Sequence, residues 1–240
     1  MVSVRAAREL LGKVAREYEH IFAALEPLAA GLADAFNGAD ILTRDDLDPL
    51  RDKVFDLLAS NRGFVAGAGV ITAPGLLADA HYCLAWWWTR PSGTPEALRV
   101  NLDPAAPDFF DYPTADWYRT PERTLARHVA GPYVDYACTT EYATTVSVPV
   151  HVDGTFLGVA AADVLVSRLE QRVLPALRRL GHSLAMVNAA GRVIASASAR
   201  YAPGHLVSLT EAEPVALSRR GAAVDWQLVD TSAGQFVRRS

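Results

Sequence analysis

The stretch that decides the fold runs from residue 142 to residue 164: YATTVSVPVHV (142–152), DG (153–154) and TFLGVAAADV (155–164). Two runs rich in β-branched residues flank an Asp-Gly pair, and this pair favours a tight hairpin turn because Asp and Gly tolerate the positive φ angles that the turn requires. In the first run Val146, Val148 and Val150 fall on every second residue, so they share one face of a strand. The sequence therefore predicts an antiparallel hairpin in the centre of a sheet, with its valine face turned toward a helix.

The N-terminal segment predicts that helix. Between residues 4 and 36, apolar side chains recur three or four positions apart, which places them on one stripe of a long helix that Pro27 should kink. They are Ala7, Leu11, Val14, Tyr18, Ile21, Leu25, Leu28, Leu32 and Phe36. Two interpretations stay open: the stripe is the face laid on the chain's own sheet, or it is the seam of a homodimer.

The remaining segments predict an α+β protein, because helices flank a mainly antiparallel sheet. Further helices are expected at 45–58, in part of 114–129, and from a capping box of Ser167 and Glu170 to Leu180. Further strands are expected at 64–72, 81–90, 98–102, 133–139, 183–188, 192–198, 224–229 and 235–238. We expect residues 1–180 to form one lobe with the long helix, and residues 181–240 to form an incomplete second-lobe-like β extension.

Composition excludes several classes of protein. The 240 residues are 50% hydrophobic, and 23 basic against 27 acidic residues give a net charge of −4, which disfavours nucleic acid as a partner. No phosphate loop, dinucleotide fingerprint or hydrolase motif occurs, so we expect no cofactor and no enzyme activity. Two cysteines, Cys83 and Cys138, and six unclustered histidines predict neither disulfides nor a metal site. Charges in the first twenty residues interrupt any secretion signal, and no apolar run is long enough to cross a membrane, so the sequence predicts a cytoplasmic protein.

Aromatic and acidic residues gather in the middle third of the chain. Trp86 and Trp88 share a face of one predicted strand, and Tyr112, Trp117, Tyr118, Tyr133 and Tyr136 follow within fifty residues. Asp135 and Asp163 fall within predicted strands, where Asp is disfavoured unless it has a role. Aromatic core and surface-facing acids are the simpler interpretation of each residue taken alone. Taken together, ring faces and carboxylates are suited to a desolvated cation such as an ammonium group.

The same residues resemble a known family of sensor domains. The stretches 111–118 (DYPTADWY), 131–135 (GPYVD), 146–150 (VSVPV) and 158–164 (GVAAADV) resemble the ligand-binding lobe of double-Cache domains, which have a long helix followed by a PAS-like antiparallel sheet. The stretch 186–194 (MVNAAGRVI) resembles the opening of a second lobe. The resemblance implies a non-catalytic sensor of small molecules.

The resemblance also implies which residues bind the ligand. In amino-acid-binding members a Tyr-x-Asp and a later Asp receive the ammonium group, and here Tyr133, Asp135 and Asp163 match them, with Trp117 and Tyr118 matching a Trp-Tyr pair. The Arg that would receive a ligand carboxylate is replaced by Ala115.

Because a buried carboxylate without a partner is costly, we expect a cationic amine such as a polyamine, a biogenic amine or a quaternary ammonium compound. Tyr112 and either Trp86 or Trp88 should close the site. Signalling should pass through a homodimer or a partner such as a transcription regulator. A scaffold of the same fold, an amino-acid binder and an enzyme are the alternatives.

Overall fold

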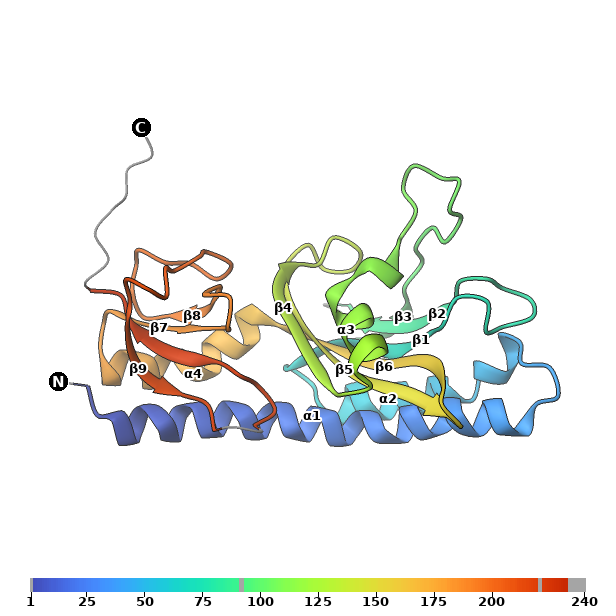
Figure 1. The fold of residues 1–240 in the computed structure, drawn as a ribbon, viewed down its shortest axis with the longest axis horizontal. Helices are drawn as coiled ribbons and strands as arrows, with labels where there is room; N and C mark the ends of the chain where they lie inside the picture. The colour runs from blue at the N-terminus through green and yellow to red at the C-terminus, as the bar shows by residue number, and fades with distance from the viewer. Residues whose placement is uncertain (1, 91–92, 220–221, 233–240) are drawn as a thin grey trace.

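The computed structural model describes residues 2–90, 93–219 and 222–232, and it consists of two antiparallel sheets laid side by side along one long helix (Figure 1). The helix α1 (Val4–Gly38) runs along the base of both sheets. The larger sheet has the strand order β3-β2-β1-β6-β5-β4 and the smaller one has the order β8-β7-β10-β9. The predicted α+β class is confirmed.

The larger sheet is made of β1 (Val65–Thr72), β2 (Leu84–Thr89), β3 (Pro95–Ala97), β4 (His128–Val134), β5 (Tyr142–Val152) and β6 (Thr155–Leu165). The smaller sheet is made of β7 (Leu184–Val187), β8 (Val193–Ser196), β9 (Glu213–Leu217) and β10 (Gln227–Asp230). The helices besides α1 are η1 (Asp45–Leu47), α2 (Leu50–Ser60), η2 (Tyr112–Thr114), α3 (Asp116–Thr124) and α4 (Val166–Leu180).

The apolar stripe of α1 is core. Leu11, Tyr18 and Leu25 are at most 1% exposed, and α1 contacts strands of both sheets. The Tyr18 ring lies edge-on to Trp226, the residue just before β10 of the smaller sheet, with ring centroids 5.0 Å apart. The Tyr18 hydroxyl bonds to Thr144 of the larger sheet over 2.7 Å. The stripe is therefore covered by the chain's own sheets, and the interpretation of this face as a homodimer seam is wrong. The helix also continues through Pro27 without a break.

The β5–β6 hairpin has the predicted boundaries to within one residue. Asp153 and Gly154 form its turn with φ angles of 49° and 80°, as a two-residue turn requires. Val146, Val148 and Val150 are buried in the same core cluster as the α1 stripe. The prediction for this face is confirmed, and by alternation the other face of β5 and β6 is turned away from α1.

Several boundaries differ from prediction for local reasons. The strand expected at 133–139 lies earlier in the chain, because β4 covers His128–Val134 and Asp135 starts a loop. The strand expected at 98–102 also lies earlier, because β3 covers Pro95–Ala97. Ser167 is not a cap: its hydroxyl donates to Glu141, and α4 begins one residue before it. Strand β9 was not predicted from the sequence. The edge strand expected at 235–238 lies outside the described residues.

Candidate functional site

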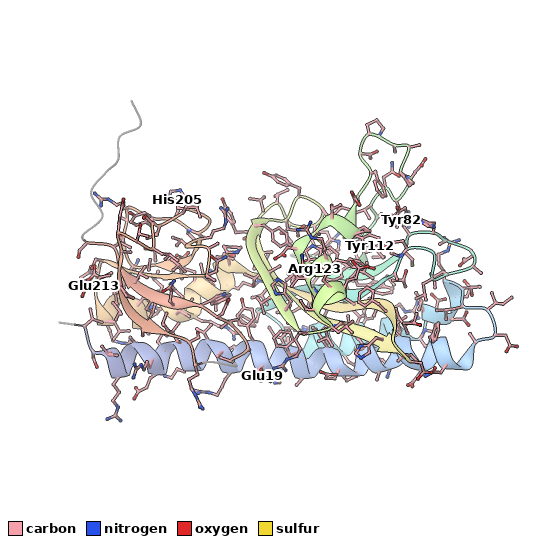
Figure 2. The ribbon with its side chains drawn as sticks, viewed as in Figure 1. Glu19, Tyr82, Tyr112, Arg123, His205 and Glu213 are labelled. Atoms are coloured by element: carbon pink, nitrogen blue, oxygen red, sulfur yellow. The ribbon has the colours of Figure 1, made fainter. Side chains whose placement is uncertain are left out.

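A cavity of about 630 Å³ lies on the face of the larger sheet opposite α1, which is within the usual size of a small-molecule site. Its walls come from β2, from the connection between β3 and α3, from α3, and from β4 with the loop that follows it. Figure 2 shows Tyr112 on this side of the sheet, away from α1.

Six of the eight residues that sequence suggested as ligand contacts line this one cavity. They are Trp86, Tyr112, Trp117, Tyr133, Asp135 and Asp163. Two do not line it. Trp88 lies further along β2 and faces the Arg90 guanidinium, 6.0 Å from the ring centroid. Tyr118 is fully buried behind the wall, edge-on to Tyr112 and Trp117.

Asp163 forms the floor of the cavity. It lies on β6 between Thr145 of β5 and Gly67 of β1, which are its register partners in the two adjacent strands. The Thr145 hydroxyl donates to Asp163 Oδ1 over 2.5 Å. Burial, and then the charge of Asp135, raise the pKa of Asp163 to about 7, because both disfavour the ionised form. A cation placed in the cavity would reverse this effect.

Gly67 makes room for the aromatic wall. A Cβ at this position would lie 2.7 Å from Trp86 Nε1, so the absence of a side chain lets the indole cover the strand next to Asp163. Trp86 is 6% exposed, and no described residue forms a hydrogen bond with its Nε1. The glycines of the Gly67-Ala68-Gly69 stretch thus accommodate this ring and the β2 backbone.

A bulge in β4 turns Tyr133 toward the floor. Ala130 pairs with Thr145, but Tyr133 rather than residue 132 pairs with Ala143, so one extra residue is inserted. The insertion moves Tyr133 onto the cavity face, where its hydroxyl bonds to Thr145. Burial and the nearby Asp163 charge raise the pKa of Tyr133, so the phenol keeps its proton.

Asp135 lies in the wall, but its carboxylate accepts hydrogen bonds from the loop that follows β4. Oδ1 accepts the backbone N–H groups of Ala137 and Cys138, each over 3.1 Å. Oδ2 accepts the Thr139 N–H over 3.2 Å and the Thr139 hydroxyl over 3.1 Å. Asp135 therefore holds the loop closed and adds negative charge to the cavity.

Tyr112 is also held by the protein itself. Its hydroxyl donates to the Thr72 carbonyl oxygen over 2.8 Å, and the residue is 1% exposed. Desolvation raises the pKa of Tyr112 to about 12, so it stays neutral. Its ring face, rather than its hydroxyl, is what the residue offers to a ligand.

Among the cavity residues that sequence reasoning missed are Thr145, Arg99, Asp108 and Asp111. The sequence around Thr145 is typical of a strand and gives no sign of a role in binding. The connection between β3 and α3 follows a path that no local pattern predicts, and it contributes Arg99, Asp108 and Asp111. Arg99 lines the cavity although no Arg was expected in the site. The lining carries four carboxylates, those of Asp108, Asp111, Asp135 and Asp163, against the one guanidinium of Arg99. Nowhere in the described part of the chain do three His, Cys, Asp or Glu side chains gather to hold a metal.

Comparisons with known proteins bear on the fold of this chain. Residues 99–171 match the model of the first PDC sensor domain of methyl-accepting chemotaxis protein-like proteins. No curated protein sequence matches the chain.

Solved structures show the same fold over almost the whole chain. Methyl-accepting chemotaxis protein X is 14% identical, covers 94% of each chain and has a TM-score of 0.69. The extracellular domain of soHK1S-Z6, which is named as a histidine kinase, is 14% identical over 95% of this chain and 91% of its own, with a TM-score of 0.64. The ligand-binding domain of the Pseudomonas fluorescens chemoreceptor CtaA, in complex with L-valine, is 14% identical over 97% and 96%, with a TM-score of 0.55.

The fold is therefore that of PDC or Cache-like sensor domains, as the sequence resemblance implied. The expected cytoplasmic location is contradicted, because the soHK1S-Z6 structure, which shares this fold over almost the whole chain, is described as the extracellular domain of a histidine kinase. The charges of the first twenty residues that suggested it, such as Arg8, Lys13 and Glu17, are simply the exposed face of α1. Among the described residues, no helix is both long and apolar enough to span a bilayer.

Proposed function

We propose that this chain is a non-catalytic sensor domain that binds a cationic amine in the cavity above Asp163. The observation that carries the proposal is the charge of the lining: four carboxylates against one guanidinium, with one carboxylate buried on the floor. An ammonium group would neutralise that floor, since opposite charges attract strongly where water is excluded.

The aromatic walls support the same ligand class. Trp86, Trp117 and Tyr133 line the cavity with Tyr112, and aromatic faces attract cations by about 0.5–2 kcal/mol per contact. Their area also accommodates the hydrocarbon part of an organic amine. A polyamine, a biogenic amine and a quaternary ammonium compound all satisfy these two criteria.

The proposal extends to the organisation and output of the chain. We assign residues 1–180 as the ligand-binding lobe with its helix and residues 181–240 as a second, β-rich lobe. The match to a chemotaxis sensor family favours a sensor domain that lies outside the cytoplasm and signals through a receptor or kinase module, rather than through a transcription regulator. A homodimer, if formed, would use a surface other than the buried stripe of α1.

A second candidate ligand is an amino acid. Arg99 lines the cavity and could receive a carboxylate, and the buried Trp86 Nε1 has no hydrogen-bond partner among the described residues. Both groups are donors, so both would suit a ligand oxygen. CtaA, which shares the fold, is described in complex with L-valine.

Titration calorimetry with matched pairs separates the two candidates. The pairs are phenethylamine with phenylalanine, tyramine with tyrosine, and putrescine with ornithine, each differing by one carboxylate. We expect the amine of at least one pair to bind more tightly than its amino acid, because four carboxylates repel the added charge. Arg99→Gln should leave amine binding intact. Tighter binding of the amino acids, abolished by Arg99→Gln, would establish the second candidate instead.

A further inference from the structure

Three side chains on the cavity floor form a hydrogen-bonded row. Tyr133 bonds to Thr145, and Thr145 bonds to Asp163. All three line the cavity, and Asp163 and Thr145 face each other across adjacent strands. The row therefore lies where an ammonium group would rest under the proposed function.

The hydrogens of this row can be assigned one by one. With an ammonium ion in the cavity Asp163 is ionised, and an ionised carboxylate only accepts, so the single hydroxyl hydrogen of Thr145 points at Asp163 Oδ1. The bond between Thr145 and Tyr133 must then use the hydrogen of the Tyr133 phenol, which keeps its proton. Tyr133 Oη is left with lone pairs and no hydrogen to donate. It can only accept from a ligand.

The carboxylates of Asp163 and Asp135 differ in how many acceptor positions remain free for a ligand. Among the described residues Asp163 accepts from Thr145 through Oδ1, and Oδ2 accepts no hydrogen bond, so the lone pairs of Oδ2 remain for a ligand. Asp135 already accepts four, which fills the roughly four acceptor positions of a carboxylate. The direct acceptors of the floor are therefore Asp163 Oδ2 and Tyr133 Oη.

We propose that this floor binds an ammonium group through its N–H bonds, with Thr145 as the positioning residue, and so selects primary and secondary amines over quaternary ammonium compounds. This inference rests on the proposed amine function and narrows its ligand class. A quaternary group would keep the cation–π attraction of the walls but would leave both acceptors without a donor. Unpaired acceptors on a desolvated floor would weaken its binding.

The test is a methylation series measured by calorimetry on the whole chain. Phenethylamine and putrescine are each compared with their N-methyl, N,N-dimethyl and N,N,N-trimethyl derivatives. We expect affinity to fall along each series that binds, with the trimethyl compound at least about 100-fold weaker than the primary amine, since two hydrogen bonds to charged or polarised groups are lost.

Variants of Thr145 test its positioning role. Thr145→Val keeps the shape but removes the hydroxyl, so Asp163 loses a donor and the Tyr133 hydrogen is released toward the ligand. We expect it to weaken primary amines about tenfold or more and to leave quaternary ones nearly unchanged, which collapses the selectivity ratio. Thr145→Ser is the matched control and should preserve the ratio. If the Val variant fails to fold in a thermal melt, Tyr133→Phe, which removes one acceptor, should lower the same ratio.

The outcomes separate the two proposals. Quaternary compounds that bind as tightly as primary amines would overturn the selectivity inference and leave the amine function standing. A wild-type ratio unchanged in Thr145→Val and Tyr133→Phe would overturn the role of the row. Absence of binding by every amine, primary or quaternary, would overturn the proposed function and this inference with it.

Discussion

Replacing Asp163 with Asn should stabilise the empty protein at neutral and alkaline pH. The carboxylate is 8% exposed, faces the charge of Asp135 and receives one hydroxyl donor, that of Thr145. Ionising it therefore costs free energy that an amide of the same shape would avoid. The Asn side chain can still accept from Thr145 through its Oδ1.

The size of the effect follows from the pKa of Asp163, which is about 7 in the folded chain against its ordinary value of 3.8. Three units correspond to about 4 kcal/mol, at roughly 1.4 kcal/mol per unit. Because the folded state holds this proton more tightly, stability falls as pH rises from about 4 to about 7 and is constant above. The Asn variant does not lose stability in this way. Its free energy of unfolding should therefore exceed that of the wild type by nearly zero at pH 4 and by at most about 4 kcal/mol at pH 8.

Thermal melting of both proteins between pH 4 and pH 8, without ligand, measures this difference. For a chain of this length about 4 kcal/mol corresponds to a difference in Tm of roughly 8–16 °C at pH 8. Asp111→Asn is the control, because that carboxylate lines the same cavity but is exposed, and it should show no such trend. Of the titratable groups that face Asp163, Tyr133 and Cys138 have raised pKa values and stay neutral in this range, and Asp135 is present in both proteins.

A constant difference across the pH range, or an Asn variant less stable than the wild type at pH 8, would refute the reasoning. The former would mean that Asp163 does not titrate near neutrality. The latter would mean that the ionised carboxylate contributes bonds in the empty protein that an amide cannot replace.

Three further predictions concern residues around the site and the core. Leu11→Glu should destabilise the chain by more than about 3 kcal/mol, because it places a charge in the core. The measurement is loss of the circular dichroism signal on mild heating. An intact fold with only a changed elution volume would instead support the interpretation of the α1 stripe as a dimer seam. Tyr112→Phe should cost about 1 kcal/mol in chemical denaturation, because it removes the shorter of the two tyrosine hydrogen bonds to the Thr72 carbonyl and leaves only that of Tyr118, at 3.5 Å. Amine affinity should change less than twofold. Gly67→Ala should displace the Trp86 indole, because the added Cβ would clash with it, while the protein still folds. Amine binding should then weaken about tenfold, the equivalent of about 1.4 kcal/mol. Unchanged affinity would show that the ring does not contact the ligand.

Much of the fold was predictable because its signals are local. The Asp153-Gly154 turn and the alternating valines specify the β5–β6 hairpin and its core face, and the spacing of apolar residues specifies α1. What the stripe of α1 packs against was not predictable, because a helix face for a sheet and a face for a second subunit have the same composition. The answer depends on Trp226 and other residues two hundred positions away.

The candidate site divides in the same way. Sequence alone determined the residue types of the site, since aromatic residues and aspartates gather in one third of the chain with the Cache-like spacing, and from them it predicts a cationic ligand. Only the tertiary structure decided which of them share a cavity and in what role. The β4 bulge aims Tyr133 at Thr145, the loop amides occupy Asp135, and the β3–α3 connection brings Arg99 to the wall. These outcomes depend on strand register and on backbone groups that any residue carries, and a linear pattern of side chains does not record them.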